Sequence, residues 1–128
     1  MAITLRRGEL DEENPSWQKV ENAIRSLSGN KDTVSLGDFR KENYLGISRN
    51  DEDLYVVFVT YKNLDCHVLV NNDVTDTEHK FVIGGQAVSY SAKYCHTLDE
   101  AVRVARIYYE TGDRDYGSTW ENGRTDTN

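Results

Sequence analysis

The sequence contains two Cys-His pairs and one further histidine whose side chains could bind a metal ion. The pairs are Cys66-His67 and Cys95-His96, and His79 lies between them in the chain. Structural zinc sites usually separate their ligands by about two to four residues, whereas neighbours on a strand point to opposite faces of the sheet. Neither pair could readily hold one ion, so we predict no metal site. We expect the cysteines to be small core residues and the histidines to lie at the surface or at a sheet edge.

A Gly84-Gly85-Gln86 tripeptide lies within the stretch HKFVIGGQAVSY, residues 79–90. The same tripeptide positions a hydrolytic water in peptide-chain release factors, but that reaction requires a basic surface that docks in ribosomal RNA. Here the two glycines separate apolar alternating runs, and a two-residue hairpin turn needs positive φ at both of its central positions. We interpret the segment as a hairpin or a glycine-bearing strand, with a backbone contact to a ligand as the remaining alternative.

The sequence has no local motif for nucleophilic or metal-assisted catalysis. It contains no G-x-S-x-G, no P-loop and no H-E-x-x-H. Aspartate and glutamate are abundant, but no spacing favours one pair of carboxyl groups as acid and base over another. We therefore predict a protein that is not an enzyme, with no catalytic residues and no cofactor.

The chain is acidic, with 15 Lys and Arg residues against 22 Asp and Glu residues and a formal net charge of −7. This charge repels phosphate backbones and anionic lipids, so we predict neither direct nucleic-acid binding nor a membrane partner. The acidic residues cluster in four segments, 9–13, 50–53, 73–78 and 110–115. These clusters are either solubilising surface or a face that docks a basic protein.

The length of 128 residues fits one domain. We predict a single α+β domain over residues 1–122 and a disordered polar tail over residues 123–128. No apolar run approaches the ~18 residues that span a bilayer, and the N-terminus lacks the apolar segment of a signal peptide. These features predict a cytoplasmic protein whose two cysteines are reduced thiols.

Two amphipathic helices are indicated by their end signals and by their apolar spacing. For the first, Asn14 is the expected N-cap and Pro15 the first helical residue, with an end near Leu27. The second opens with a capping box formed by Thr97 and Glu100, and it closes at Gly112. In each helix the apolar residues recur on one face, which is expected to pack on a sheet.

The strand signals are strongest in the middle of the chain. LYVVFVTY, residues 54–61, is apolar on both alternating faces and suits a central strand, and CHVLV, residues 66–70, reads as its hairpin partner. Weaker candidates cover residues 3–7, 33–36 and 44–48, and residues 80–91 supply one or two more. We predict an α+β fold with a largely antiparallel sheet of about five strands and two amphipathic helices packed on one face.

The order of these elements resembles that of a known family. NPSWQKVENAIRSL, then YLGI, then FVIGGQAV, then LDEAVRVARIYYETGDRDYGSTWE resembles the immunity proteins of bacterial polymorphic-toxin systems, particularly those associated with deaminase toxins. Those proteins show an early Asn-Pro-Ser/Thr-Trp helix start, a Gly-Gly-Gln segment, and a late helix that runs into a Thr-Gly and a C-terminal Trp. The resemblance covers most of residues 3–121.

The resemblance implies a cytoplasmic protein that binds a toxin domain, such as a deaminase or nuclease, and blocks its active site or the access of its substrate. A basic toxin cleft would be complementary to the acidic charge of this chain. The matching glycines and Gln86 are expected at scaffold positions, whereas Trp120 either folds over the core or contacts the partner. The candidate partner-binding residues are Asp51, Glu52, Asp53, Asp113, Asp115, Tyr116 and Trp120.

Two alternatives to an immunity protein follow from the residues themselves. The first is a small regulatory or structural protein that uses its sheet to form a homodimer. The second is a small-ligand binding or catalytic domain, for which a deep pocket lined by Tyr90, Tyr94 and His96 would be the telling observation.

Overall fold

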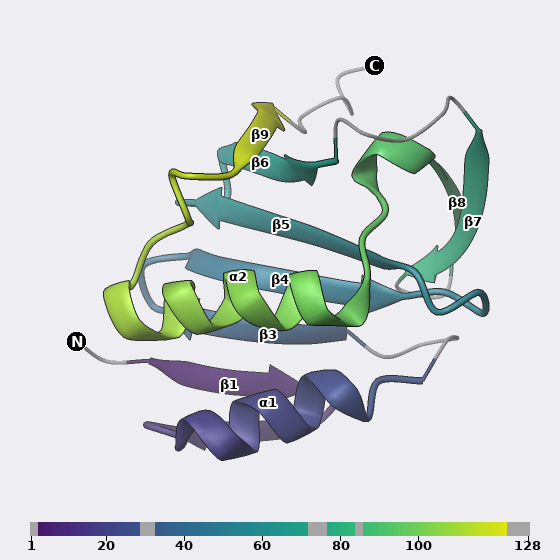
Figure 1. Cartoon of the computed structure of the whole chain (residues 1–128). Coiled ribbons are helices and arrows are strands. Elements are labelled where there is room, and N and C mark those ends of the chain that lie inside the picture. Colours follow the sequence, from purple (N-terminus) through teal and green to yellow (C-terminus); the bar gives the residue numbers. More distant parts are fainter. Residues whose placement is uncertain (1–2, 29–32, 72–76, 84–85, 123–128) are drawn as a thin grey trace.

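The computed structural model describes residues 3–28, 33–71, 77–83 and 86–122 (Figure 1). Seven strands form the main sheet in the order β2-β1-β3-β4-β5-β6-β9, and β7 and β8 form a separate two-stranded sheet. All of the strand pairs are antiparallel. The main sheet contains β1 (Thr4–Arg7), β2 (Leu10–Glu13), β3 (Thr33–Asp38), β4 (Asn43–Arg49), β5 (Tyr55–Tyr61), β6 (Asp65–Val70) and β9 (Thr119–Asn122).

Two helices, α1 (Trp17–Arg25) and α2 (Leu98–Thr111), lie in front of the same face of the main sheet (Figure 1). We call this the inner face. The main core forms between the helices and alternate residues of the strands, because period-two alternation puts every second side chain on that face. Val20 and Ile24 of α1 and Ala105 of α2 are fully buried there. The predicted apolar faces of both helices are therefore the faces that pack on the sheet.

The second sheet covers part of the opposite, outer face of the main sheet. It consists of β7 (Glu78–Ile83) and β8 (Gln86–Ser91), and a single 3-10 turn, η1 (Ala92–Tyr94), follows it. Val56, Val68, Phe81 and Cys95 form a second, smaller core between the two sheets. The main sheet is thus covered by helices on its inner face and in part by a hairpin on its outer face.

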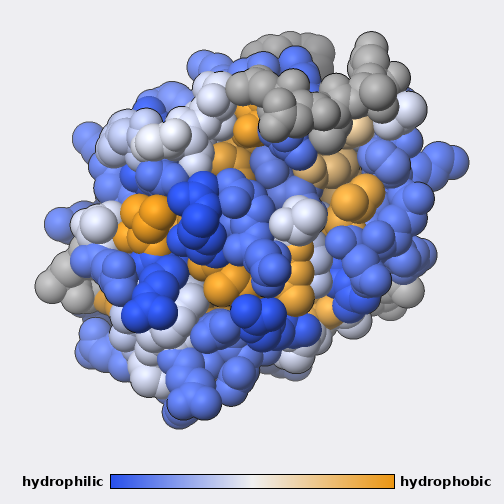
Figure 2. Space-filling view, in the orientation of Figure 1, coloured by the Kyte–Doolittle hydropathy of each residue, from blue (hydrophilic) through white to orange (hydrophobic). Residues whose placement is uncertain are grey.

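On the side of the molecule that carries the helices, hydrophilic side chains dominate the surface and the apolar ones emerge as separate patches (Figure 2). Three large apolar or aromatic residues of the described chain are strongly exposed, namely Leu10, Leu64 and Tyr116. They come from three different segments of the chain. None of the described helices is both long and apolar enough to cross a bilayer.

The prediction of about five strands was too low. The two strands that were missed are β2 and β9, at the two edges of the main sheet. Leu10–Glu13 reads as an acidic cluster, and Thr119–Asn122 reads as a polar tail. Both edge strands are mostly exposed, and a strand that buries no face shows little of the alternation that reveals a buried strand.

The start of the first helix also differs from its prediction. Ser16 caps α1 by accepting a hydrogen bond from the Lys19 N–H at 3.2 Å. Asn14 instead adopts a positive φ of 51° and donates its N–H to the Ile3 carbonyl at 2.8 Å. Asn tolerates this left-handed conformation, so it turns the chain toward α1 rather than capping it.

The ends of α2 were predicted correctly. The Thr97 hydroxyl accepts from the Glu100 N–H at 3.2 Å, and Gly112 ends the helix with φ of 78°. The Glu100 carboxylate, which a capping box would direct back toward Thr97, instead receives hydrogen bonds from Arg103.

The predicted hairpins are also present. β5 pairs with β6, with Tyr61 opposite Asp65. The Leu64 N–H donates to the Tyr61 carbonyl at 3.0 Å, and the two residues between them, Lys62 and Asn63, have positive φ, as in a type I′ turn. β7 pairs with β8, with Ile83 opposite Gln86, so the strands on the two sides of the Gly-Gly segment form a hairpin pair. The conformation of Gly84 and Gly85, like that of the tail at residues 123–128, lies outside the described residues.

We predict that Gly37→Ala destabilises the protein more than Gly46→Ala. A Cβ at Gly37 would lie 2.3 Å from the Asn43 carbonyl oxygen and 2.5 Å from the Tyr44 Cα, both of them backbone atoms of β4. A Cβ at Gly46 would meet the Phe58 ring at 2.4 Å, and a ring at the end of a side chain can turn away. We expect Gly37→Ala to lower the free energy of unfolding by about 2 kcal/mol, measured by urea denaturation, and equal losses for the two variants would contradict this account.

Candidate partner-binding site

The loop between α2 and β9 is built around the carboxylate of Asp113. The Tyr61 hydroxyl and the Arg114 N–H, the latter at 2.8 Å, donate to its Oδ1. The Tyr116 hydroxyl donates to its Oδ2 at 2.9 Å. Asp113 therefore ties the last residue of β5 to the exposed part of the loop.

Arg114 adds cation–π contacts with two tyrosine rings. Its Cζ lies 5.4 Å from the Tyr61 ring centroid and 4.7 Å from the Tyr116 ring centroid, within the range of an attractive contact. The Tyr116 side chain is held at both its ring and its hydroxyl, yet the residue is 67% exposed. The loop thus presents a fixed aromatic side chain to the solvent.

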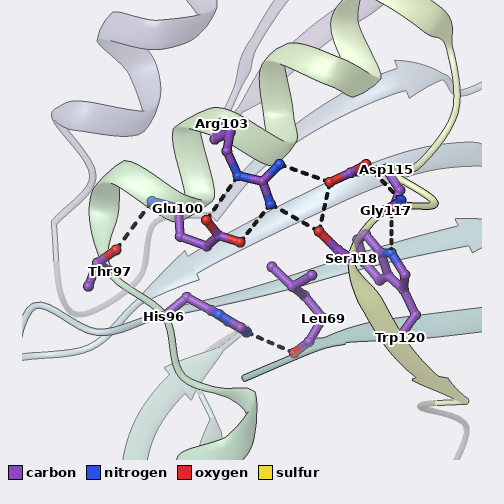
Figure 3. A network of polar contacts seen from close by, with 9 residues as sticks. All are labelled: Leu69, His96, Thr97, Glu100, Arg103, Asp115, Gly117, Ser118 and Trp120. Atoms are coloured by element: carbon purple, nitrogen blue, oxygen red, sulfur yellow. Dashed lines mark hydrogen bonds and ion pairs between the residues drawn. The ribbon is translucent and has the colours of Figure 1, made fainter. Parts of the chain in front are cut away.

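Asp115 fixes the second half of the loop through a separate set of contacts (Figure 3). Its Oδ1 accepts from the Gly117 N–H at 2.9 Å, and its Oδ2 accepts from the Ser118 hydroxyl at 2.7 Å. Its backbone carbonyl accepts from the Trp120 indole N–H at 2.8 Å. The Asp115 carboxylate thus holds Gly117 and Ser118 of its own loop, and its carbonyl holds Trp120 of β9.

Arg103 joins this loop to α2, and the sequence analysis did not identify it. Its guanidinium donates to both oxygens of Glu100, to Asp115 Oδ2 at 2.9 Å and to the Ser118 hydroxyl at 3.0 Å (Figure 3). The spacing of Glu100 and Arg103, three residues apart on a helix, was a signal for their ion pair. Nothing in the local sequence pointed to Asp115, because that contact forms only when the loop folds back along the helix.

Trp120 was expected either to fold over the core or to contact the partner. It stands opposite Leu69 in the β6–β9 register, and its half-buried ring packs against the main core. Its position and its bond to Asp115 make it part of the framework that holds the loop.

The acidic residues Asp51, Glu52 and Asp53 form the turn between β4 and β5. The buried Asn50 side chain shapes this turn, since its Oδ1 accepts from the Glu52 N–H at 2.9 Å and from the Leu54 N–H at 3.0 Å. Glu52 Oε1 forms a hydrogen bond with Nδ1 of His79 in β7 at 2.9 Å, and Asp53 forms an ion pair with Arg49. Among the described residues, no cation pairs with Asp51.

The structure separates the predicted partner-binding residues into two groups. Residues 51–53 precede the first residue of β5, whereas Asp113 contacts Tyr61, its last residue. A strand of seven residues extends about 20 Å. The acidic turn and the α2–β9 loop therefore lie at opposite ends of the sheet.

The histidines and cysteines are not gathered into a metal site among the described residues. The two cysteines form no disulfide; Cys95 is buried and Cys66 is half-buried. The prediction for His96 was wrong, because it is only 4% exposed and its Nε2 donates to the Leu69 carbonyl at 2.8 Å (Figure 3). Burial lowers the pKa of His96, so a neutral imidazole is favoured.

The three residues expected to line one ligand pocket are also separated. Tyr90 and Tyr94 line a pocket on the outer face of the main sheet. His96 instead lines a polar pocket beside Arg103.

No model of a known protein family matches the chain, and no curated protein sequence matches it at a significant level.

We predict that Arg103→Gln loosens the α2–β9 loop. The substitution retains a good helix former but removes the cation that joins Glu100 to Asp115. Because the Arg103 side chain is 47% exposed, the expected loss of global stability is only about 0.5–1 kcal/mol. Amide exchange at Gly117 and Ser118 should be clearly faster. Arg106→Gln is the matched control, since Arg106 lies on the same helix and pairs with Glu110, and it should leave exchange in the loop unchanged.

The loop should also become less stable in acid. The Ser118 hydroxyl lowers the pKa of Asp115, with Arg103 and the Gly117 N–H adding to the effect. Burial would raise the pKa of Asp113, but hydrogen bonds from Tyr61, Arg114 and Tyr116 lower it overall. Folding therefore favours the charged carboxylates.

The charged carboxylates of Asp113 and Asp115 contribute fully to the free energy of unfolding above the ordinary carboxyl pKa of 3.8. This contribution is lost as the pH falls through the lower pKa values of the two groups in the folded state. The free energy of unfolding, followed by tryptophan fluorescence, should thus decrease below about pH 4. The decrease should be smaller in Asp115→Asn, and an unchanged acid dependence in that variant would refute the assignment.

Proposed function

We propose that this chain is an immunity protein that binds a bacterial toxin domain, such as a deaminase or nuclease, and blocks its active site or the access of its substrate. The observation that carries the proposal is Tyr116, which is 67% exposed and yet held by Asp113 and Arg114. The kind of partner is inferred from the resemblance of the motif order to immunity proteins and from the acidic charge.

A fixed, exposed tyrosine favours protein binding for an energetic reason. Association costs about 0.5–1.5 kcal/mol for each flexible side chain that must be ordered at the interface. Tyr116 is already ordered by contacts within its own loop, so less of this cost falls on binding. Tyrosine is also among the residues most enriched in the energetic centres of protein interfaces.

The charge distribution supports a basic partner. The net charge is −7, and the side chains of Glu52 and Asp53 in the acidic turn are 61% and 71% exposed. The Asn50 side chain accepts hydrogen bonds from two backbone N–H groups of this turn, and the Glu52 and Asp53 side chains contact His79 and Arg49. Acidic groups of this kind speed the approach of a basic protein and can replace the phosphates that a nucleic-acid-binding cleft would otherwise contact.

The test is co-expression with the toxic C-terminal domain encoded beside the gene. The unaltered chain should restore growth, and Tyr116→Ala should restore it less well. Removing a residue at an energetic centre costs about 2 kcal/mol or more, so affinity between the purified domains should fall about thirtyfold. The rate of association should also decrease as salt is added, because salt screens the attraction between acidic and basic surfaces.

Leu10→Ala is the matched control. Leu10 is 52% exposed and lies on β2, at the opposite edge of the sheet from β9, so growth should be restored as by the unaltered chain. Thermal unfolding establishes that both variants are folded. If the unaltered chain does not restore growth, or if no toxin is encoded nearby, the immunity function is refuted. Full rescue by Tyr116→Ala would refute only the site.

A further inference from the structure

A pocket of about 440 Å³ opens on the outer face of the main sheet, beside β8. Val56, Phe58 and Val68 of the sheet form its apolar part, and Tyr90 and Tyr94 form an aromatic wall. The two tyrosine rings meet edge to face, with centroids 6.4 Å apart. The volume lies within the range of about 300–1,000 Å³ that is typical of small-molecule sites.

Tyr90 lines this pocket and carries a phenol hydroxyl that can donate a hydrogen bond. The described residues provide no hydrogen bond to it, although Cys66 and Cys95 lie near enough to influence its titration. Burial raises the pKa of Tyr90, so the phenol keeps its proton at neutral pH. A phenol in a half-apolar pocket gains from an acceptor on a bound molecule, because an unpaired polar group that loses water is costly.

The charges around the pocket favour a neutral ligand. None of the described lining residues is charged; besides the two tyrosines, the polar ones are Ser89, Ser91, Asn122 and Cys66. The nearby carboxylate of Glu121 already accepts from the Tyr94 hydroxyl at 2.7 Å and pairs with Lys93 at 3.3 Å. A charged ligand would lose its hydration in this pocket without gaining a free counter-ion.

We propose that this pocket binds a neutral, planar aromatic molecule of two fused rings that carries a carbonyl or ring-nitrogen acceptor. The aromatic body packs between Phe58 and the two tyrosines, which suits offset or edge-to-face ring contacts. The acceptor atom of the ligand accepts a hydrogen bond from the Tyr90 hydroxyl. The site is separate from Tyr116 and needs no protein partner, so it stands or falls independently of the immunity function.

The test uses coumarin, a neutral bicyclic lactone with a carbonyl acceptor, and the anion coumarin-3-carboxylate as its matched control. Both are titrated into the full chain and followed by two-dimensional NMR. Coumarin should shift the methyl resonances of Val56, Val68 and Val88, whereas the anion should bind at least about tenfold more weakly because of the cost of burying its charge. Shifts spread over the whole surface, or equal affinity for the two compounds, would overturn the proposal.

Three variants examine the position of the ligand. Tyr90→Phe should weaken coumarin binding about twofold to tenfold, the usual effect of one neutral hydrogen bond. Val88→Trp places a large ring at the pocket wall and should abolish binding. Val82→Trp is its control, since Val82 lies on the neighbouring strand one residue from Phe81, the partner of Val88, and therefore points to the other face of the hairpin.

Circular dichroism and the Phe81 resonances establish that the hairpin remains packed in each variant. If Val88→Trp proves unfolded, Tyr90→Phe still decides the role of the hydroxyl, and the site is decided by whether coumarin and a second neutral bicycle, 2-quinolone, both shift the Val56 and Val68 methyl resonances of the unaltered chain. Unchanged affinity in Tyr90→Phe, or failure of both neutral compounds to bind, would overturn the assignment.

Discussion

The burial of β5 on both faces is the constraint on which the other features of this structure depend. Its inner residues Val57 and Val59 lie in the main core, and its outer residue Val56 lies in the second core beneath the hairpin. A shift of one residue would exchange the two sets of side chains, so the register of the strand is strongly fixed. The acidic turn precedes this strand, and Tyr61 at its end bonds Asp113 of the α2–β9 loop. The pocket on the outer face is lined by Val56 and Phe58 of the same strand.

The carboxylates of this acidic chain do two different kinds of work. The carboxylates of Asp113 and Asp115 accept hydrogen bonds from within the chain, and they determine the shape of the loop in which Tyr116 is exposed. In the acidic turn the buried Asn50 amide shapes the backbone. Asp51 forms no ion pair with a described residue. The exposed group contributes to the field that attracts or repels a partner, whereas the internal group contributes to the rigidity of the surface that the partner meets.

Much of the fold could be predicted from local patterns. The capping signals and apolar spacing of α2 and the alternation of β5 and β6 are encoded within each segment, and the structure has these elements where they were expected. The edge strands β2 and β9 were missed because their residues are mostly exposed, and only pairing with β1 and β6 makes them strands. The N-cap moved from Asn14 to Ser16 because the chain needs a left-handed residue to leave β2.

The candidate site divides in the same way. The sequence by itself determined that the chain is acidic, that it has no catalytic motif, and that Asp113, Asp115 and Tyr116 follow the end of a helix at Gly112. Tertiary structure alone decided that the residues at 51–53 lie at the other end of the sheet, that Arg103 joins Glu100 to Asp115, and that His96 is buried against Leu69. The physical reason is that these contacts join residues far apart in the chain, and no local pattern specifies which distant partner the packing of the core will bring near.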